Sequence, residues 1–131
     1  MKNKVRLIYR HFPLSGKEGH ENSDFAAYAL EYAEEKGKYW PALEYFFNVA
    51  SLDDLNSIEG ILFAVKKLGL DDVDFRKRLA DGDKKLLEAV EGDKQRASQA
   101  GMNETPTYFI FAKGLPTRSA DGKGVETTLN M

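Results

Sequence analysis

Apolar residues recur three or four positions apart through the middle of the chain, from about residue 23 to residue 100. This spacing predicts a series of helices. They are expected to begin near Ser23, Pro41, Ser51, Asp71 and Asp83. Four of them are followed by a glycine, which commonly ends a helix because it adopts positive φ at little cost: Gly37, Gly69, Gly82 and Gly101. The segment from Ser51 to Leu68 has the most regular apolar stripe and is expected to form one helix.

Strand-forming residues lie on both sides of this helical region. Residues 5–12 and 107–112 are rich in β-branched and aromatic residues, and each segment predicts a strand. Residues 125–129 predict a third, short strand. One strand, several helices and a final strand pair together indicate an α/β domain. We therefore expect a single domain over residues 1–131, with a helical insertion over residues 23–100.

Composition narrows the class of protein. The chain has 131 residues, of which 42% are hydrophobic and 31% charged, with a net charge of −2. This balance is too even to predict a nucleic-acid partner or a membrane partner. No apolar run reaches the roughly 20 residues that cross a bilayer, and the basic start is not followed by the apolar core of a signal peptide. The sequence therefore predicts no export signal and leaves the compartment open.

Few side chains are available for chemistry. The chain has no cysteine, which excludes disulfides, thiolate catalysis and zinc–thiolate sites. His11 and His20 are expected to be structural or exposed, because two distant histidines do not make a metal site. Acidic residues occur as adjacent pairs, which point in different directions on a helix and make poor acid–base couples. We therefore predict no catalytic residue, no metal ligand and no cofactor.

Several segments, in their order and spacing, nevertheless resemble one known family. They are residues 5–14, His20 with the alanines of the following helix, residues 37–40, residues 68–71 leading to Phe75, and residues 105–109. Together these segments resemble the DsbA-like branch of the thioredoxin superfamily. That family begins with a strand and a Cys-x-x-Cys motif, and neither precedes residue 5 here. The resemblance implies an incomplete thioredoxin-like α/β fold, a small sheet with a helical insertion.

The same resemblance suggests a function. It implies a thiol–disulfide oxidoreductase without its redox cysteines, a truncated or inactive form of a family that is often extracytoplasmic. Thr105-Pro106 resembles the family's cis-proline loop, which holds an extended peptide, and Glu104 would lie at its mouth. We therefore predict substrate binding by Glu104, Thr105 and Pro106.

Two alternatives and one structural question remain open at this point. The chain is also compatible with a non-catalytic, chaperone-like peptide-binding module, or with a relative of glutathione-dependent isomerases and kappa-type transferases. The missing strand would leave a gap in the sheet, with unpaired backbone groups. Direct pairing of the two remaining strands, exchange of a strand or edge-to-edge pairing in a homodimer would close it.

Overall fold

The computed structural model describes residues 6–18, 20–102, 105, 108–111 and 118–120. Its internal contacts divide the chain into two compact units. The first, residues 11–96, contains five helices and most of a sixth. The second combines residues 1–10 with residues 97–131 and contains two short strands. The expectation of one domain over residues 1–131 stays a prediction.

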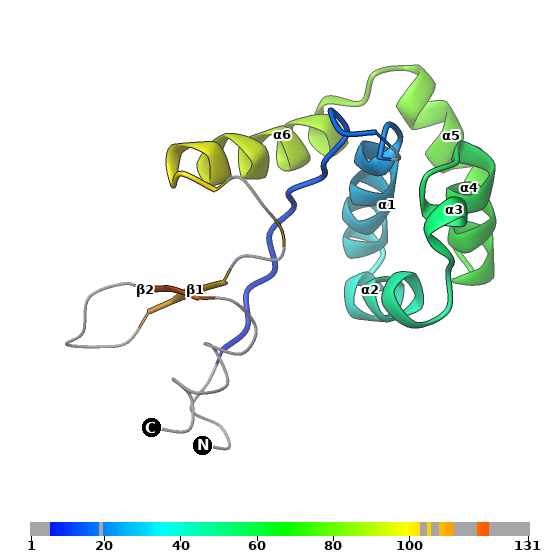
Figure 1. Ribbon diagram of the computed structural model, residues 1–131. Coiled ribbons are helices and arrows are strands. Elements are labelled where there is room, and N and C mark those ends of the chain that lie inside the picture. Colours follow the sequence, from blue (N-terminus) through cyan, green and yellow to red (C-terminus); the bar gives the residue numbers. More distant parts are fainter. Residues whose placement is uncertain (1–5, 19, 103–104, 106–107, 112–117, 121–131) are drawn as a thin grey trace. The chain divides into compact units, whose positions relative to one another are not determined.

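The helices follow one another along the chain with short connections (Figure 1). They are α1 (Ser23–Glu35), α2 (Tyr39–Asn48), α3 (Leu52–Leu55), α4 (Ile58–Lys67), α5 (Asp72–Ala80) and α6 (Lys84–Gln99). The predicted helix ends are confirmed by the four glycines at 37, 69, 82 and 101, which all have φ between 68° and 78°. Asp71 caps α5 by accepting a hydrogen bond from the amide of Asp74 at 3.0 Å.

The core of the helical unit lies where α1 meets α2 and α4, and where α4 meets α5. Its largest buried side chains come from α1, α4, α5 and α6: Tyr32, Ile61, Val65, Phe75, Leu86 and Val90. Burying a side chain of this size stabilises a fold by about 1.5–3 kcal/mol. Ala33 and Ala42 are fully buried, and their small size lets α1 and α2 approach closely.

The expected continuous helix from Ser51 to Leu68 is wrong, because the chain breaks between α3 and α4. Ser51 and Asp54 form a capping box at the start of α3, in which each backbone amide donates to the other residue's side chain. Ser57 then caps a new helix by accepting from the amide of Gly60 at 3.0 Å. Asn56, at the break, is held by two hydrogen bonds with Asn22 before α1. The break is thus fixed by contacts with a distant segment, which apolar spacing does not reveal.

Gly60 allows the two short helices to meet. A Cβ atom at this position would lie 2.2 Å from the carbonyl oxygen of Asp54, a distance that no side chain tolerates. Glycine is therefore required here by the close approach of the backbone of α3, although it is a poor helix former elsewhere.

Of the predicted strands, only the one over residues 107–112 is confirmed, and only in part. Residues 6–12 form no strand, and Leu7 and Ile8 are 68% and 58% exposed. Strand preference depends on a neighbouring strand to pair with, and the described residues offer none to this segment. The prediction over 107–112 is confirmed in part by β1 (Tyr108–Ile110), which pairs antiparallel with β2 (Arg118–Ala120), Phe109 opposite Ser119. The predicted strand over 125–129 lies outside the described residues.

The expected α/β, incomplete thioredoxin-like fold is therefore wrong. In the part of the chain that the structure describes, three-residue β1 and β2 pair only with each other, and the other regular elements are six helices. A thioredoxin-like sheet needs the N-terminal segment as a strand, and that segment is not paired. The expected homodimer through sheet completion loses its basis for the same reason.

Candidate functional site

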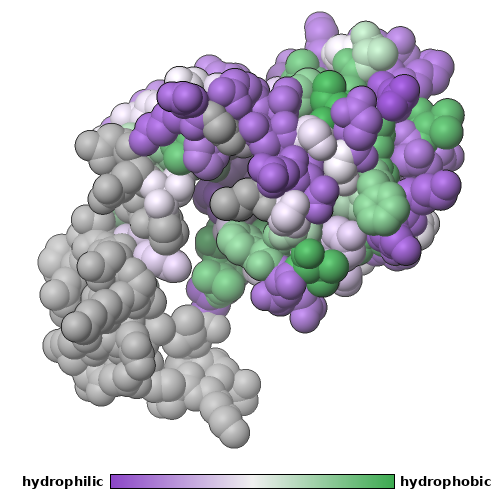
Figure 2. Space-filling model, turned by 45° about the vertical axis from the view of Figure 1, so that its right-hand side comes forward, coloured by the Kyte–Doolittle hydropathy of each residue, from purple (hydrophilic) through white to green (hydrophobic). Residues whose placement is uncertain are grey.

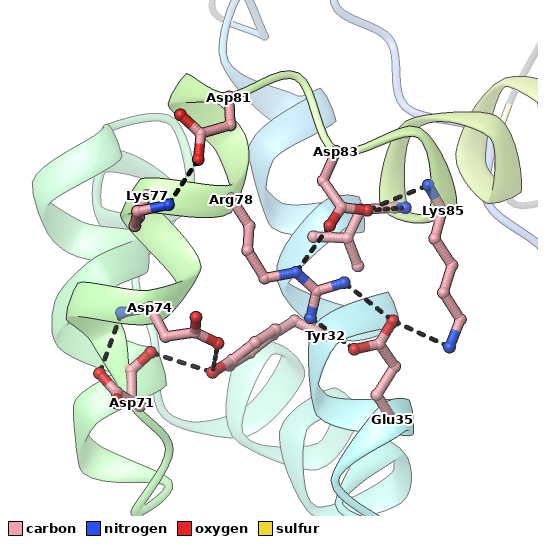
Figure 3. Close-up of polar contacts among 10 residues, drawn as sticks. Tyr32, Glu35, Asp71, Asp74, Lys77, Arg78, Asp81, Asp83 and Lys85 are labelled. Atoms are coloured by element: carbon pink, nitrogen blue, oxygen red, sulfur yellow. Dashed lines mark hydrogen bonds and ion pairs between the residues drawn. The ribbon is translucent and has the colours of Figure 1, made fainter.

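A polar network connects α1, α5 and the start of α6 (Figure 3). Arg78 on α5 donates from both terminal nitrogens to the two carboxylate oxygens of Glu35 on α1, at 2.5 and 3.1 Å. Its Nε donates to Asp83, just before α6, at 2.8 Å. Lys85 approaches the same Glu35 carboxylate at 3.3 Å. One guanidinium thus holds the ends of three helices through charge-assisted hydrogen bonds.

Tyr32 forms the buried end of this network. Its hydroxyl donates to the carboxylate of Asp74 at 2.8 Å and lies 3.2 Å from the carbonyl oxygen of Asp71. Its ring packs against Phe75, with centroids 5.2 Å apart, and the Arg78 guanidinium lies 5.4 Å from its centre. The residue therefore combines a core aromatic contact with a polar one, as buried tyrosines usually do.

The environment fixes the protonation states in the network. Burial, with the hydrogen bond to Asp74, raises the pKa of Tyr32 to about 12. Hydrogen bonds from Arg78 lower the pKa of Glu35 and of Asp83, and the two carboxylates raise the pKa of the guanidinium. General acid–base catalysis needs a group that exchanges protons near neutral pH. None of these groups does so, and we interpret the network as a connection between helices.

A second buried polar cluster surrounds His11. The imidazole Nε2 lies 2.7 Å from the carboxylate of Glu31 on α1, and the backbone amide of His11 donates to Asp93 on α6 at 3.0 Å. Asp93 in turn accepts from Arg96 at 3.0 Å. This placement supports the expectation that His11 is structural, because its hydrogen bonds connect the segment before α1 to both α1 and α6.

The residues predicted to bind substrate are only partly described. Thr105 lies exposed at a bend, and Glu104 and Pro106 lie outside the described residues. Their assignment to substrate binding stays a prediction. In the described ranges no group of three or more acidic, histidine or cysteine side chains is placed to hold a metal ion.

A groove on the outer surface runs between α4 and α5. It is lined by apolar side chains of both helices and by charged side chains at its rim: Glu59, Leu62, Phe63, Lys66, Asp72, Val73 and Arg76. Phe63 and Val73 are 57% and 72% exposed. Lys67 lies beside them, with its ammonium 5.3 Å from the centre of the Phe63 ring. Figure 2 shows one face of the molecule, on which hydrophobic patches lie among hydrophilic side chains.

Within the described segments, no helix has both the length and the apolar character needed to cross a bilayer. No family model matches the chain, and no solved structure matches it.

Several curated proteins are similar to most of the chain, and all of them are named as Na⁺/H⁺ antiporters. The antiporter NhaA 1 of Mycobacterium sp. (strain KMS) is 35% identical over 106 residues, which cover 81% of this chain and 16% of the relative. The antiporter NhaA of Herminiimonas arsenicoxydans is 31% identical over 112 residues, 85% of this chain and 16% of the relative. The chain thus spans about one sixth of the length of the curated relatives it matches.

These relatives overturn the assignment to the DsbA-like family. They are named as cation/proton antiporters and not as disulfide oxidoreductases, and the described helices do not form a thioredoxin-like sheet. The predicted oxidoreductase and its two alternatives, the peptide-binding module and the glutathione-dependent relative, are therefore wrong. The expected absence of a membrane partner is contradicted as well, because the relatives are named as Na⁺/H⁺ antiporters. The chain is similar to a segment of such proteins.

Proposed function

We propose that this chain is a helical, water-facing accessory domain of a Na⁺/H⁺ antiporter and that it modulates ion exchange by the transporter. The observation that carries the proposal is the similarity of 31–35% over 81–85% of the chain to several proteins of that name. The similarity covers only about one sixth of those proteins, so the exchange chemistry is assigned to the remainder of the polypeptide.

The chemistry of the helices supports a domain that faces water. The apolar side chains of α1, α4 and α5 point into a shared core, and their outer faces carry charged residues. Glu34, Lys66, Lys67, Arg76 and Lys77 are all exposed. A helix with one apolar face and one charged face is typical of a domain packed in water.

The test uses a relative that contains the matching segment. The Herminiimonas arsenicoxydans antiporter is purified with and without that segment and reconstituted into liposomes, and Na⁺-driven proton movement is followed with a pH-sensitive dye. We expect the deletion to change the rate of exchange or its dependence on Na⁺ concentration or pH. Equal exchange by both forms across all conditions, with equal amounts in the liposomes, would contradict the proposal. Liposomes with the 131-residue chain alone serve as the control and should show no exchange.

A further inference from the structure

The groove between α4 and α5 brings several cations and exposed apolar side chains together. Three exposed cations border it, Lys66, Lys67 and Arg76, and none of them makes an ion pair within the described part of the chain. Most of the cations elsewhere on α5 and α6 are paired. Lys77, Arg78, Lys85, Lys94 and Arg96 each have a carboxylate within 4 Å, whereas Lys84 has no such ion pair in the described part of the chain. The groove therefore keeps positive charge available to a partner.

Apolar side chains lie between these cations. Phe63 on α4 and Val73 on α5 line the groove and are more than half exposed. The ammonium group of Lys67 lies over the ring of Phe63, so a positive charge is directly adjacent to an exposed apolar side chain. Glu59 and Asp72 also line the groove, which leaves three cations to two carboxylates.

We propose that this groove binds the surface of a bilayer containing anionic lipids, with Phe63 and Val73 entering the headgroup region and Lys66, Lys67 and Arg76 contacting lipid phosphates. Exposed apolar residues flanked by lysine and arginine fit such a surface, because apolar burial and attraction to anionic headgroups act together. The choice of a lipid surface rests on the proposed function, because an accessory domain of an antiporter lies beside a bilayer.

A second exposed apolar patch provides a matched control. Phe47 and Val49, at the end of α2, are as exposed as Phe63 and Val73, and the exposed charge nearest along that face of α2 is the carboxylate of Glu44. An anionic surface would repel this patch. A comparison of the two patches thus distinguishes binding by the groove from nonspecific hydrophobic adsorption to the vesicles.

The experiment measures co-sedimentation of the 131-residue chain with vesicles of phosphatidylcholine alone or mixed equally with phosphatidylglycerol. We expect binding to the mixed vesicles at low salt and little binding to phosphatidylcholine. The double variant K66Q/K67Q should lower partitioning about thirtyfold, because each cation near an anionic surface contributes roughly a fivefold change. Phe63→Ala should lower it about tenfold. Phe47→Ala should leave it unchanged. Circular dichroism confirms that all variants fold.

Three results would overturn the inference: no partitioning into the mixed vesicles, equal loss with Phe47→Ala, or a dimer in light scattering that Phe63→Ala dissociates. The last would assign the groove to a second copy of the chain. Lipid binding without any effect of segment deletion on exchange would overturn only the proposed function. An effect on exchange without lipid binding would overturn only the inference about the groove.

Discussion

Lys77 and Arg78 are neighbours on α5, and each pairs with a carboxylate, but their surroundings differ. The Lys77 ammonium lies 2.8 Å from Asp81, four residues later at the C-terminal cap of the same helix, with side chains 75% and 61% exposed. Arg78 lies inward, with its side chain 20% exposed, and reaches Glu35 on α1 and Asp83 before α6 (Figure 3). One pair stays within a helix and the other connects three segments.

The difference shows which ion pair holds the domain together. An exposed pair within a helix gains little, because water and salt screen it and two long side chains must be ordered. The guanidinium of Arg78 donates in a fixed fork to Glu35, a geometry that an ammonium does not reproduce. Removing one partner of such a sheltered pair leaves the other charge without compensation. We therefore expect substitutions at these adjacent positions to have unequal effects.

The largest expected effect is that of Arg78→Met. This change removes three hydrogen bonds at similar side-chain volume. It leaves Asp83 without the guanidinium and leaves Glu35 with the exposed Lys85 as its remaining cation. We expect the free energy of unfolding to fall by about 2–3 kcal/mol, somewhat below the range for a fully buried pair. Urea denaturation followed by circular dichroism measures it. A loss no greater than that of Lys77→Met would break the distinction between the two cations.

Tyr32→Phe is expected to have the next largest effect. It keeps the ring contact with Phe75 but removes the hydrogen bond to Asp74, at a cost of about 1–2 kcal/mol. The folded-state pKa of Tyr32 is raised to about 12, above its usual value of 10.0, so its contribution is present below pH 10 and is lost as the pH rises toward 12. Thermal unfolding at alkaline pH should therefore be less pH-dependent in Tyr32→Phe. If the unfolding temperatures of the natural chain and of Tyr32→Phe fell equally with rising pH, the stabilising role of the Tyr32 hydroxyl would be contradicted.

The acidic side of the pH profile should depend on Arg78 as well. Because Arg78 lowers the folded-state pKa of Glu35 and of Asp83, their contribution is present above the usual values of 4.5 and 3.8. It is lost as the pH falls through the lowered folded-state values. We expect the stability of the natural chain to fall more steeply in acid than that of Arg78→Met. Unfolding midpoints measured from neutral pH downward test this. An equal pH dependence of the midpoint in the natural chain and in Arg78→Met would argue against the ion pairs of Arg78 with Glu35 and Asp83.

The smallest effect is expected for Lys77→Met. Its partner Asp81 is exposed and remains hydrated after the change, so the unfolding midpoint should stay within the error of the measurement. The same denaturation series supplies the comparison with Arg78→Met. A clear destabilisation by Lys77→Met would show that the pair within α5 contributes more than its exposure suggests.

The sequence predicts the helices well because the signals for them are local. Asp71 caps α5 and Gly69 ends α4 through residues that lie next to them in the chain. The break before Ser57 depends on Asn22, more than thirty residues away, and residues 6–12 lack the partner strand that their composition suggests. Such long-range contacts do not appear in a periodic pattern.

The candidate sites were harder to predict for the same reason. Tyr32 continues the apolar stripe of α1, so the pattern does not distinguish it from an ordinary core residue. Nothing in the sequence near Glu35 indicates its ion pair with Arg78, which is 43 positions later in the chain. The local signal is that Arg78 is next to Leu79, which packs against the core. The exposed groove is not predicted from the sequence, because Phe63 and Val73 lie on the same helices as buried apolar residues such as Ile61 and Phe75. Apolar spacing does not distinguish the exposed residues from the buried ones.

We propose that this helical chain acts as part of a Na⁺/H⁺ antiporter. The most direct test replaces the matching segment of the Herminiimonas arsenicoxydans antiporter with residues 1–131 and measures Na⁺-driven proton exchange in liposomes. We predict that the replacement restores the exchange behaviour lost on deletion of the segment, and that it does so with Lys77→Met but less well with Arg78→Met at elevated temperature. Exchange that is unaffected by deletion, or is not restored by this chain when it is folded, would contradict the claim.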